Sequence, residues 1–517
     1  MIYRIKEYND LKQRVSSMDV DDLLRCVICP DYHENDQINA TESAALMLHP
    51  TTTENALRII QSVNGKTRGE RALVTADMEF GAGGALIGGT RFPSMRAAAE
   101  AGDENLAYEM GVTAASEAMA AGYSWTFGPC IDILGNHRNP VVSIRTAGED
   151  ADTVLRYGEA YMRGLQDTGM ISTLKHFPGD GYASNDQHVT VVYNPLSCEE
   201  WDASFGKVYQ TLIGKGAKAI MAGHVGLPSY DEIDPETGLY PPATLSKNLL
   251  TGLLREKLGF EGIIISDAIE MSGFCGYMNF YRACARFLEA GGDCLLFFHE
   301  SEESFSAMKK LIDGGELTLD TLRNRAYRML CFAREYYEQA KIKSRQPDSI
   351  RADACVKKMT YGAVKTVRDR GGLLPVCGDR KLRVAHVVLH NAGTPEMIAA
   401  NDLTQKLKER FDVVDELRDP GPRKLQAIAK SGEYDLMICS IVSQASYGLN
   451  CIQISGLVAR NFMRGWMRYD TPVVFVCYYD PYFCEDFEAI ADTVINTYGY
   501  SKYTNDAVLE QLFGKNG

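Results

Sequence analysis

Between about residue 22 and residue 298 the sequence alternates short apolar runs with segments of helical periodicity. Candidate strands are residues 23–29, 72–76, 124–127, 171–174, 217–222, 262–266 and 292–298, and candidate helices include residues 105–121, 151–166, 246–258 and 277–290. Such alternation indicates a mainly parallel sheet covered by helices. Seven or eight strand–helix units favour a (β/α)8 TIM-like barrel over an open sheet.

A second strand–helix series follows residue 371, with candidate strands at residues 384–389, 436–441, 472–478 and 493–496. Four short parallel strands predict a smaller α/β sandwich domain. Residues 317–340 fit a long amphipathic helix, and the polar, proline-containing residues 341–349 fit a linker. We therefore expect a TIM-barrel-like domain at residues 1–345, a linker and connecting helix at 346–375, and a C-terminal α/β domain at 376–517.

Charge and hydropathy narrow the classes of partner. The chain has 68 acidic and 54 basic residues and a formal net charge of −14. Nucleic acid and anionic membrane surfaces would be repelled overall, so a neutral or small substrate is expected. No apolar run reaches the roughly 18 residues of a membrane span, and the first residues lack the apolar core of a signal peptide. These features predict a cytoplasmic protein.

Fourteen cysteines are spread singly along the chain, many of them inside apolar runs. This pattern is typical of reduced, packed thiols. Cys26 and Cys29 form a Cys-x-x-Cys, but they lie in the candidate strand 23–29, where they would face opposite sides. Because no second pair follows, we expect no zinc site and no other cofactor.

The glycine-rich residues 81–89 follow a candidate strand, as in nucleotide-binding sites. No helical segment and no acidic residue about twenty positions on completes a dinucleotide fingerprint. We expect instead a tightly turned loop at the mouth of a site.

The segment that carries most chemistry is Lys175-His176-Phe177-Pro178-Gly179-Asp180-Gly181, followed by Asp186-Gln187-His188. The apolar lead-in of residues 171–174 predicts a strand, and the Pro-Gly-Asp-Gly turn ends it. Ligands of α/β folds gather at the carboxyl ends of parallel strands, so the charged groups are well sited for binding or catalysis. The alternative is a surface loop that happens to contain two histidines.

A second chemical feature is Asp267, which follows the buried candidate strand 262–266. A carboxylate at the end of a barrel strand lies where active sites form. The alternative is an N-cap for the following helix.

These segments resemble glycoside hydrolase family 3. Lys175-His176-Phe177-Pro178-Gly179 resembles the family signature, and Asp186-Gln187-His188 resembles the Asp-x-His dyad of its β-N-acetylglucosaminidase branch. Residues 254–262 ahead of Ser266-Asp267 resemble the nucleophile segment, and similar motifs recur in order from residue 72 to residue 298. The branch usually has Asp-x-Glu-Gly-Gly-Arg where this chain has Asp77-Met78-Glu79-Phe80-Gly81 and no arginine before Arg91.

The resemblance implies a retaining exo-acting β-N-acetylglucosaminidase. Asp267 would be the nucleophile, His188 the acid and base, and Asp186 the group that orients the imidazole. The implied substrate-binding residues are Asp77, Arg145, Lys175, His176 and Met271, with Arg91 in place of the motif arginine. His224 would line the site or support the nucleophile's strand, and Asp132 would hold a loop together.

Several alternatives stay open at this point. A phosphorylase would use phosphate in place of water, which a neutral spent histidine permits. A β-glucosidase-type enzyme and a catalytically silent sugar-binding protein also fit. The substrate's leaving group is a cell-wall muropeptide sugar, a chitin fragment or another glycoconjugate. The second domain would serve in packing, in a homodimer contact or as a wall of the leaving-group site.

Overall fold

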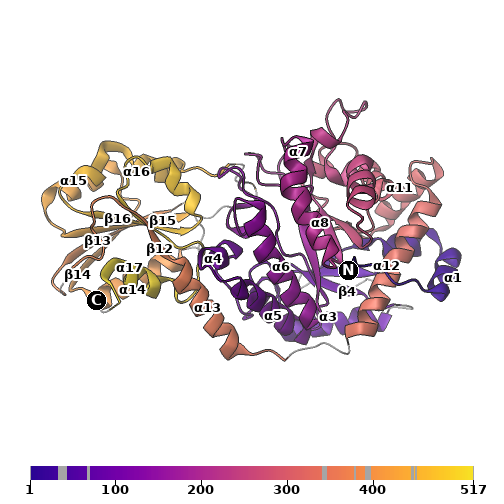
Figure 1. The fold of residues 1–517 in the computed structure, drawn as a ribbon, viewed down its shortest axis with the longest axis horizontal. Coiled ribbons are helices and arrows are strands. Elements are labelled where there is room, and N and C mark those ends of the chain that lie inside the picture. Colours follow the sequence, from indigo (N-terminus) through magenta and orange to yellow (C-terminus); the bar gives the residue numbers. More distant parts are fainter. Residues whose placement is uncertain are drawn as a thin grey trace. The chain divides into compact units, whose positions relative to one another are not determined.

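The computed structural model describes residues 2–32, 43–66, 70–340, 346–377, 380–390, 397–443, 448 and 451–515. The chain divides into two compact units, Met1–Arg91 with Glu104–Ala352, and Phe92–Asp103 with Asp353–Gly517 (Figure 1). Residues 341–345 of the expected linker lie outside the described residues. The boundary between the units falls within helix α13 (Ser349–Ala363).

The first unit is built on a curled, parallel seven-stranded sheet in the order β10-β8-β6-β5-β4-β3-β2. Its strands are β2 (Asp31–Tyr32), β3 (Ala45–Leu48), β4 (Leu73–Ala76), β5 (Trp125–Thr126), β6 (Ile171–Phe177), β8 (Ala219–Ala222) and β10 (Ile263–Ser266). A parallel pair, β1 (Ile28–Cys29) with β11 (Leu295–Leu296), lies between the two edges. Ile265 bridges to Cys294 ahead of β11, and β1 continues through Pro30 into β2. The circuit of strands confirms the predicted (β/α)8 arrangement.

Helices follow the strands around this barrel. They are α1 (Asn9–Ser17), α2 (Val20–Cys26), α3 (Thr53–Lys66), α5 (Glu104–Ala120), α6 (Ala151–Thr168), α7 (Cys198–Trp201), α8 (Lys207–Gly214), α9 (Ser272–Cys275), α10 (Phe280–Ala290), α11 (Glu302–Asp313) and α12 (Leu319–Ala340), with a π-helical segment η6 (Asn248–Lys257). Two short strands, β7 (Val192–Tyr193) and β9 (Val225–Gly226), pair beside the barrel.

Local sequence explains how strand β6 is placed. The Asp150 carboxylate accepts a hydrogen bond from the Thr153 N–H and begins α6. Gly169, at φ 111°, ends that helix, because glycine adopts the left-handed region without steric cost. Two residues later β6 begins, and all of its residues are buried. The capped helix therefore delivers Lys175 and His176 to the end of a core strand.

At the start of the chain one prediction was wrong and one strand was not predicted. Residues 23–29 were expected to form one strand, but α2 occupies Val20–Cys26 and only Ile28–Cys29 are extended. Asp19 caps this helix by accepting from the Asp22 N–H, and the acidic first turn favours helix over strand. Cys26 therefore lies on a helix. Strand β3 was missed, because its alanine, leucine and methionine residues have helical rather than β propensity.

The second unit contains a six-stranded sheet in the order β12-β17-β16-β15-β13-β14. The strands are β12 (Lys365–Asp369), β13 (Arg383–His390), β14 (Val413–Arg418), β15 (Leu436–Ser443), β16 (Val473–Tyr479) and β17 (Thr493–Asn496), and the helices include α4 (Met95–Glu100), α14 (Ile398–Arg410), α15 (Pro422–Ser431), α16 (Gly456–Asn461) and α17 (Thr504–Phe513). All neighbouring strands are parallel except β12 with β17.

This sheet is covered by helices on both faces, as the α/β sandwich prediction required. Helices α14 and α17 lie on one face and α15 and α16 on the other (Figure 1). Alternation along β13 places Val384 in one apolar core and Ala385 in the other.

The predicted number of strands in this domain, four, was too low. Strand β12 lies inside the stretch 346–375 that was expected to hold only a linker and a connecting helix. Strand β14 has polar, exposed positions that conceal its strand character.

Across the described residues, no helix combines the length and the apolar character that a membrane crossing requires.

Candidate active site

Four strands of the barrel bring the predicted polar residues to one end of the sheet. Asp77 follows β4, Lys175 and His176 lie near the end of β6, His224 follows β8, and Asp267 follows β10. Parallel strands present their carboxyl ends at the same edge, so residues almost 200 positions apart in the chain become neighbours.

The Lys175 ammonium is almost completely buried and lies between two carboxylates. Its Nζ is 2.8 Å from Asp77 Oδ1 and 2.6 Å from Glu79 Oε1. Burial disfavours the charged amine, but the attraction of Asp77 and Glu79 outweighs it and raises the pKa of Lys175 above its usual value. Lys175 is therefore a permanent cation whose position is fixed by two partners.

Glu79 also binds Arg145 in a two-pronged ion pair. Arg145 Nε donates to Glu79 Oε2 at 2.8 Å, and Nη2 donates to Oε1 at 2.6 Å. Burial opposes ionisation of Glu79, yet the attraction of Arg145 and Lys175 holds its pKa well below the usual range. Sequence reasoning gave Glu79 no role, although it occupies the glutamate position of the Asp-x-Glu motif.

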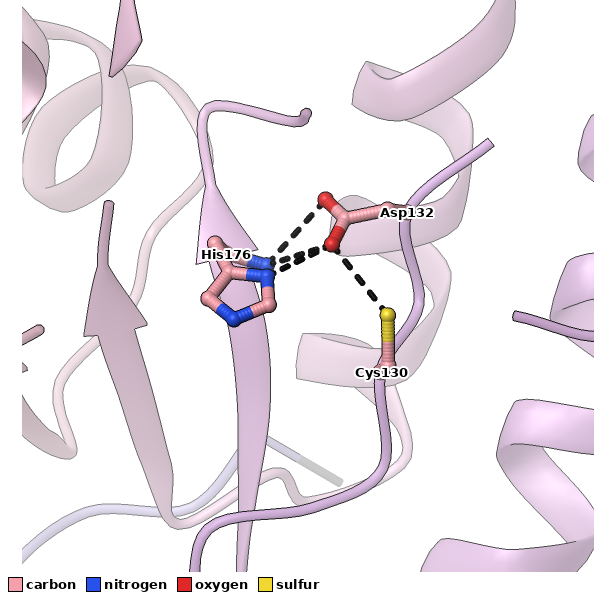
Figure 2. A group of neighbouring side chains, drawn as sticks. All are labelled: Cys130, Asp132 and His176. Atoms are coloured by element: carbon pink, nitrogen blue, oxygen red, sulfur yellow. Dashed lines mark hydrogen bonds and ion pairs between the residues drawn. The ribbon is translucent and has the colours of Figure 1, made fainter. Parts of the chain in front are cut away.

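His176 is held by a buried hydrogen-bond cluster with Asp132 and Cys130 (Figure 2). His176 Nδ1 lies 2.6 Å from Asp132 Oδ2, and the His176 backbone N–H donates to both carboxylate oxygens. The opposite ring nitrogen, Nε2, lies 3.3 Å from Arg145 Nη2. Because a guanidinium can only donate, this contact makes Nε2 the acceptor and leaves the ring proton on Nδ1, facing Asp132.

The Cys130, Asp132 and His176 side chains also have the donor types of a metal site. Their donor groups are already used in hydrogen bonds: the thiol donates to Asp132 Oδ2 at 3.2 Å, and the Asp180 N–H donates to Oδ1 at 2.8 Å. Burial raises the pKa of the Cys130 thiol well above its usual value, which opposes thiolate ligation. The cluster fits a scaffold that orients His176 and ties the turn after β6.

Asp267 is a partly exposed carboxylate with few hydrogen-bond partners. Its Oδ1 accepts from the Ala268 N–H at 2.8 Å, and its Oδ2 lies 4.0 Å from His176 Nε2. Burial favours the neutral form, but the attraction of His176, His224, Lys175 and His188 lowers the pKa of Asp267. The Asp267 side chain keeps 14% of its surface exposed.

His188 and Asp186 form a closely bonded pair on the loop after β6. Asp186 Oδ1 lies 2.6 Å from His188 Nδ1 and also accepts the His188 backbone N–H at 2.8 Å. Asp186 is fully buried, whereas 30% of the His188 side chain is exposed. A buried carboxylate therefore sets the orientation of a ring that solvent and substrate can reach.

His224 lies behind the Asp267 loop. Its Nε2 is 2.9 Å from the Ala268 carbonyl oxygen, its Nδ1 is 3.1 Å from Thr244 Oγ1, and its ring packs against Phe274. Burial lowers the pKa of His224, so the ring is neutral at pH 7. Of the two roles left open for it, these contacts favour support of the Asp267 loop.

The remaining predicted residues differ in placement. Met271 is buried, and its N–H donates to the Ala268 carbonyl, which places it on the Asp267 loop. Arg91 is exposed, and within the described part of the chain no hydrogen bond or ion pair joins it to Asp77, Lys175 or Arg145.

The glycine-rich loop packs directly against the site. A Cβ at Gly84 would lie 2.1 Å from the Asp77 carbonyl oxygen, and Gly81 has φ 101°. The glycines therefore serve close packing beside Asp77, in agreement with the expected tight turn.

Known proteins are similar to this chain in sequence. The "Beta-N-acetylglucosaminidase/beta-glucosidase" of Cellulomonas fimi is 29% identical over 494 residues, covering 91% of this chain and 86% of that protein. The "Beta-hexosaminidase" of Pasteurella multocida (strain Pm70) is 32% identical over 261 residues, covering 49% of this chain and 71% of that protein.

Two solved structures cover almost the whole chain. The "Beta-glucoside phosphorylase BglX" is 26% identical, with a TM-score of 0.87 and coverage of 98% of this chain and 93% of that one. A glycoside hydrolase family 3 β-N-acetylglucosaminidase from Paenibacillus sp. str. FPU-7 is 21% identical. Its TM-score is 0.78, and the match covers 96% of this chain and 97% of that one. The second likeness shows the shared fold alone.

Residues 20–332, more than half of the chain, match the family described as "Glycosyl hydrolase family 3 N terminal domain". The family resemblance expected from the sequence is thereby confirmed, and this chain belongs to glycosyl hydrolase family 3.

Proposed function

We propose that this glycoside hydrolase is a retaining, exo-acting β-N-acetylglucosaminidase that works through a covalent glycosyl-enzyme. The observation that carries the proposal is the pairing of an ionised, accessible Asp267 with a His188 ring clamped by buried Asp186. His188 is close enough to contribute to the lowered pKa of Asp267. Acetal cleavage needs one nucleophile and one group that exchanges a proton with the leaving oxygen.

In the first step, Asp267 Oδ2 attacks the anomeric carbon and the glycosidic bond breaks. The imidazolium of His188 gives its Nε2 proton to the departing oxygen, and the neutral ring remains bonded to Asp186. In the second step, His188 removes a proton from water, and the hydroxide oxygen attacks the anomeric carbon. The bond to Asp267 breaks and the carboxylate is regenerated, so both groups return to their starting state.

The fixed charges beside Asp267 suit recognition of a terminal sugar. Lys175 and Arg145 are cations held by Glu79, and Asp77 is half-exposed beside Lys175. Together they offer hydrogen-bond donors and an acceptor to sugar hydroxyls without side-chain reorganisation. With His176, these residues form the proposed sugar-binding site.

A phosphorylase is the second candidate, and a specific observation favours it. The solved structure named "Beta-glucoside phosphorylase BglX" covers 98% of this chain with a TM-score of 0.87. After the first step a spent carboxylic acid would be anionic and would repel phosphate, whereas spent His188 is neutral. Phosphate would then attack the glycosyl-enzyme and yield a sugar 1-phosphate.

The sugar's 2-substituent is the other open choice. The Cellulomonas fimi relative is named for both N-acetylglucosamine and glucose substrates. We favour N-acetylglucosamine because the chain carries the Asp-x-His dyad at Asp186 and His188, and we keep a β-glucosidase as the alternative. None of the fourteen cysteines forms a disulfide within the described residues, which fits a reducing compartment, and we propose the cytoplasm as the location.

The test compares turnover of nitrophenyl β-N-acetylglucosaminide and of nitrophenyl β-glucoside. Each substrate is assayed without phosphate and at inorganic phosphate concentrations that rise about tenfold per step, and the products are identified by mass spectrometry. The proposal predicts N-acetylglucosamine as the product from the first substrate. Phosphate-dependent formation of a sugar 1-phosphate would establish the phosphorylase instead. Turnover of neither substrate by folded protein would refute both.

A further inference from the structure

Gln187 lies between the two residues of the Asp186–His188 pair, and its side chain points into the protein. It is completely buried. Its Nε2 donates to Asp180 Oδ2 at 3.2 Å, and its Oε1 accepts from the His224 backbone N–H at 2.8 Å. Both ends of the carboxamide are therefore bonded to the ends of neighbouring strands, since Asp180 follows β6 and His224 follows β8.

The backbone around Gln187 makes a third attachment, to the loop that follows Asp267. The Gly273 N–H donates to the Gln187 carbonyl at 3.1 Å, and the Ser272 N–H donates to the His188 carbonyl at 3.0 Å. A Cβ at Gly273 would lie 2.7 Å from the Gln187 carbonyl oxygen, so the two loops are in close contact. The segment with His188 is thus attached after β6, after β8 and after β10.

The partner of the carboxamide is a buried carboxyl group. Asp180 is almost fully buried, and burial together with nearby Asp132 raises its pKa to about 6. It accepts hydrogen bonds from the Gly181 N–H, from Asn139 Nδ2 and from Gln187. A buried carboxylate requires such donors, because each missing hydrogen bond leaves a charge without compensation.

A carboxamide meets both demands at neutral pH. It donates to the Asp180 carboxylate and at the same time accepts from the His224 N–H. An ionised glutamate could only accept, and an apolar side chain could do neither. The identity of the residue between Asp186 and His188 is therefore chemically constrained.

We propose that Gln187 is a positioning residue for the acid–base histidine. Its carboxamide fastens the His188 loop to the ends of β6 and β8, so that the imidazole is held at a fixed place relative to Asp267. This inference rests on the proposed acid–base role of His188. If a catalytic group is displaced by about 1 Å, the rate can fall by about 100-fold.

The first experiment uses the Gln187→Met variant, which keeps side-chain length but removes both hydrogen bonds. Values of kcat/KM are measured with dinitrophenyl and with phenyl β-N-acetylglucosaminides. Dinitrophenolate leaves without a proton, so this substrate bypasses the acid. We expect a loss of about 100-fold with the phenyl substrate and less than about threefold with the dinitrophenyl substrate.

The matched control is Gln166→Met. Gln166 Nε2 bonds to Ser172 Oγ and to the Gly216 carbonyl, near the amino ends of the same two strands, away from the His188 loop. This variant is expected to keep wild-type kcat/KM with both substrates. Equal losses with both substrates in Gln187→Met, or no loss at all, would overturn the inference.

A second variant, Gln187→Glu, keeps the test decisive if Gln187→Met does not fold. The introduced carboxyl would face Asp180, with Asp132 and His176 beyond it and His224 on the other side. Below about pH 6 the two carboxyl groups can share a proton, which restores a donor. The ratio of variant to wild-type kcat/KM with the phenyl substrate should rise at least about tenfold from pH 7.5 to pH 5. A ratio that does not change with pH would contradict the proposed clamp.

The His188→Ala variant separates the two claims. If it loses activity with the phenyl substrate but not with the dinitrophenyl substrate, the acid role is supported and the Gln187 data test positioning alone. If His188→Ala shows no leaving-group dependence, the proposed function fails first, and the positioning inference fails with it.

Discussion

Two buried ionic clusters lie at opposite ends of the same barrel and differ in how completely their charges are satisfied. Near the amino ends of β10 and β11, Asp293 is bound by Arg255 at 2.7 Å and Arg328 at 2.8 Å, and it also accepts the Ile264 N–H. The guanidinium groups donate in addition to backbone carbonyls, such as that of Gly262. Both carboxylate oxygens of Asp293 and both guanidinium groups are therefore engaged by protein partners.

The cluster at the carboxyl ends is organised differently. The cations Lys175 and Arg145 are balanced by Glu79 and Asp77. Asp267, in contrast, accepts one backbone N–H and is partly exposed, and His188 is partly exposed as well. The comparison teaches that burial and charge alone do not mark an active site. The proposed functional end is the one where ionised groups keep room for a further partner, as expected for the carboxyl-terminal end of a barrel.

The largest expected effect is on catalysis by Asp267→Ala. Removing the nucleophile should lower kcat/KM for nitrophenyl β-N-acetylglucosaminide by about 10⁴-fold or more. The unfolding free energy should change by less than about 1 kcal/mol, because the side chain makes few bonds. Steady-state kinetics and urea unfolding of the same preparation measure both quantities. A large loss of stability would show that Asp267 has a structural role like that of Asp293, and would contradict the proposed difference between the two clusters.

The next largest effect is on stability, by Asp293→Ala. This change leaves Arg255 and Arg328 buried without their carboxylate, which should cost about 3–5 kcal/mol of unfolding free energy. The kcat/KM per folded molecule should stay near the wild-type value. Urea titration followed by circular dichroism gives the first value, and active-site titration corrects the second. Unchanged stability would show that the amino-end cluster is not structural.

Two buried carboxyl groups near opposite ends of the barrel, Asp293 and Asp180, should respond oppositely to pH. Burial opposes ionisation of Asp293, but Arg328, Arg255 and Arg325 lower its pKa to about 2, so its stabilisation is present above pH 4 and is lost as pH falls toward 2. Asp180 has the reverse shift, from 3.8 to about 6, so folding favours its neutral form, and that contribution is lost as pH rises through 6.

The Asp180→Asn variant tests the direction of the Asp180 pKa shift. The unfolding free energy of the variant minus that of the wild type should increase by about 2–3 kcal/mol from pH 4 to pH 7, since each pKa unit corresponds to about 1.4 kcal/mol. Urea unfolding of both proteins at five pH values measures the difference. A difference that is constant with pH would mean that Asp180 titrates alike in the folded and unfolded chain.

The smallest effect is expected for Arg91→Ala. Arg91 is exposed and lies apart from the ion pairs of Lys175 and Arg145. Its removal should change kcat/KM by less than about threefold and stability by less than about 0.5 kcal/mol. A tenfold rise in KM would restore Arg91 to the sugar-binding site and enlarge the functional cluster.

The sequence was sufficient to predict the position of site residues that follow a clear strand pattern. Lys175, His176 and Asp267 each come at or after a β-branched apolar run, so their place at the carboxyl ends follows from pattern and from the closed parallel sheet. Strand β3 was not predicted, because its alanine, leucine and methionine residues do not separate strand from helix.

Contacts that depend on how loops fold were beyond sequence reasoning. Glu79 reaches Arg145 only because the turn after β4 brings them together across 66 positions of sequence. Gln187 lies between two residues with a recognised pattern and gives no periodic signal of its own. Asp293 is embedded in an apolar run, and its three arginines come from η6 and α12. Each of these pairings is set by tertiary packing.

The most direct test of the account is to trap the covalent intermediate. The enzyme is incubated with a ring-fluorinated N-acetylglucosaminyl fluoride, which forms glycosyl-enzymes that break down slowly, and intact mass and peptide mapping follow. The account predicts one added sugar on the peptide that contains Asp267, and no adduct in Asp267→Ala. Inactivation with the sugar on another residue, or turnover with inverted product and no adduct in wild type, would contradict it.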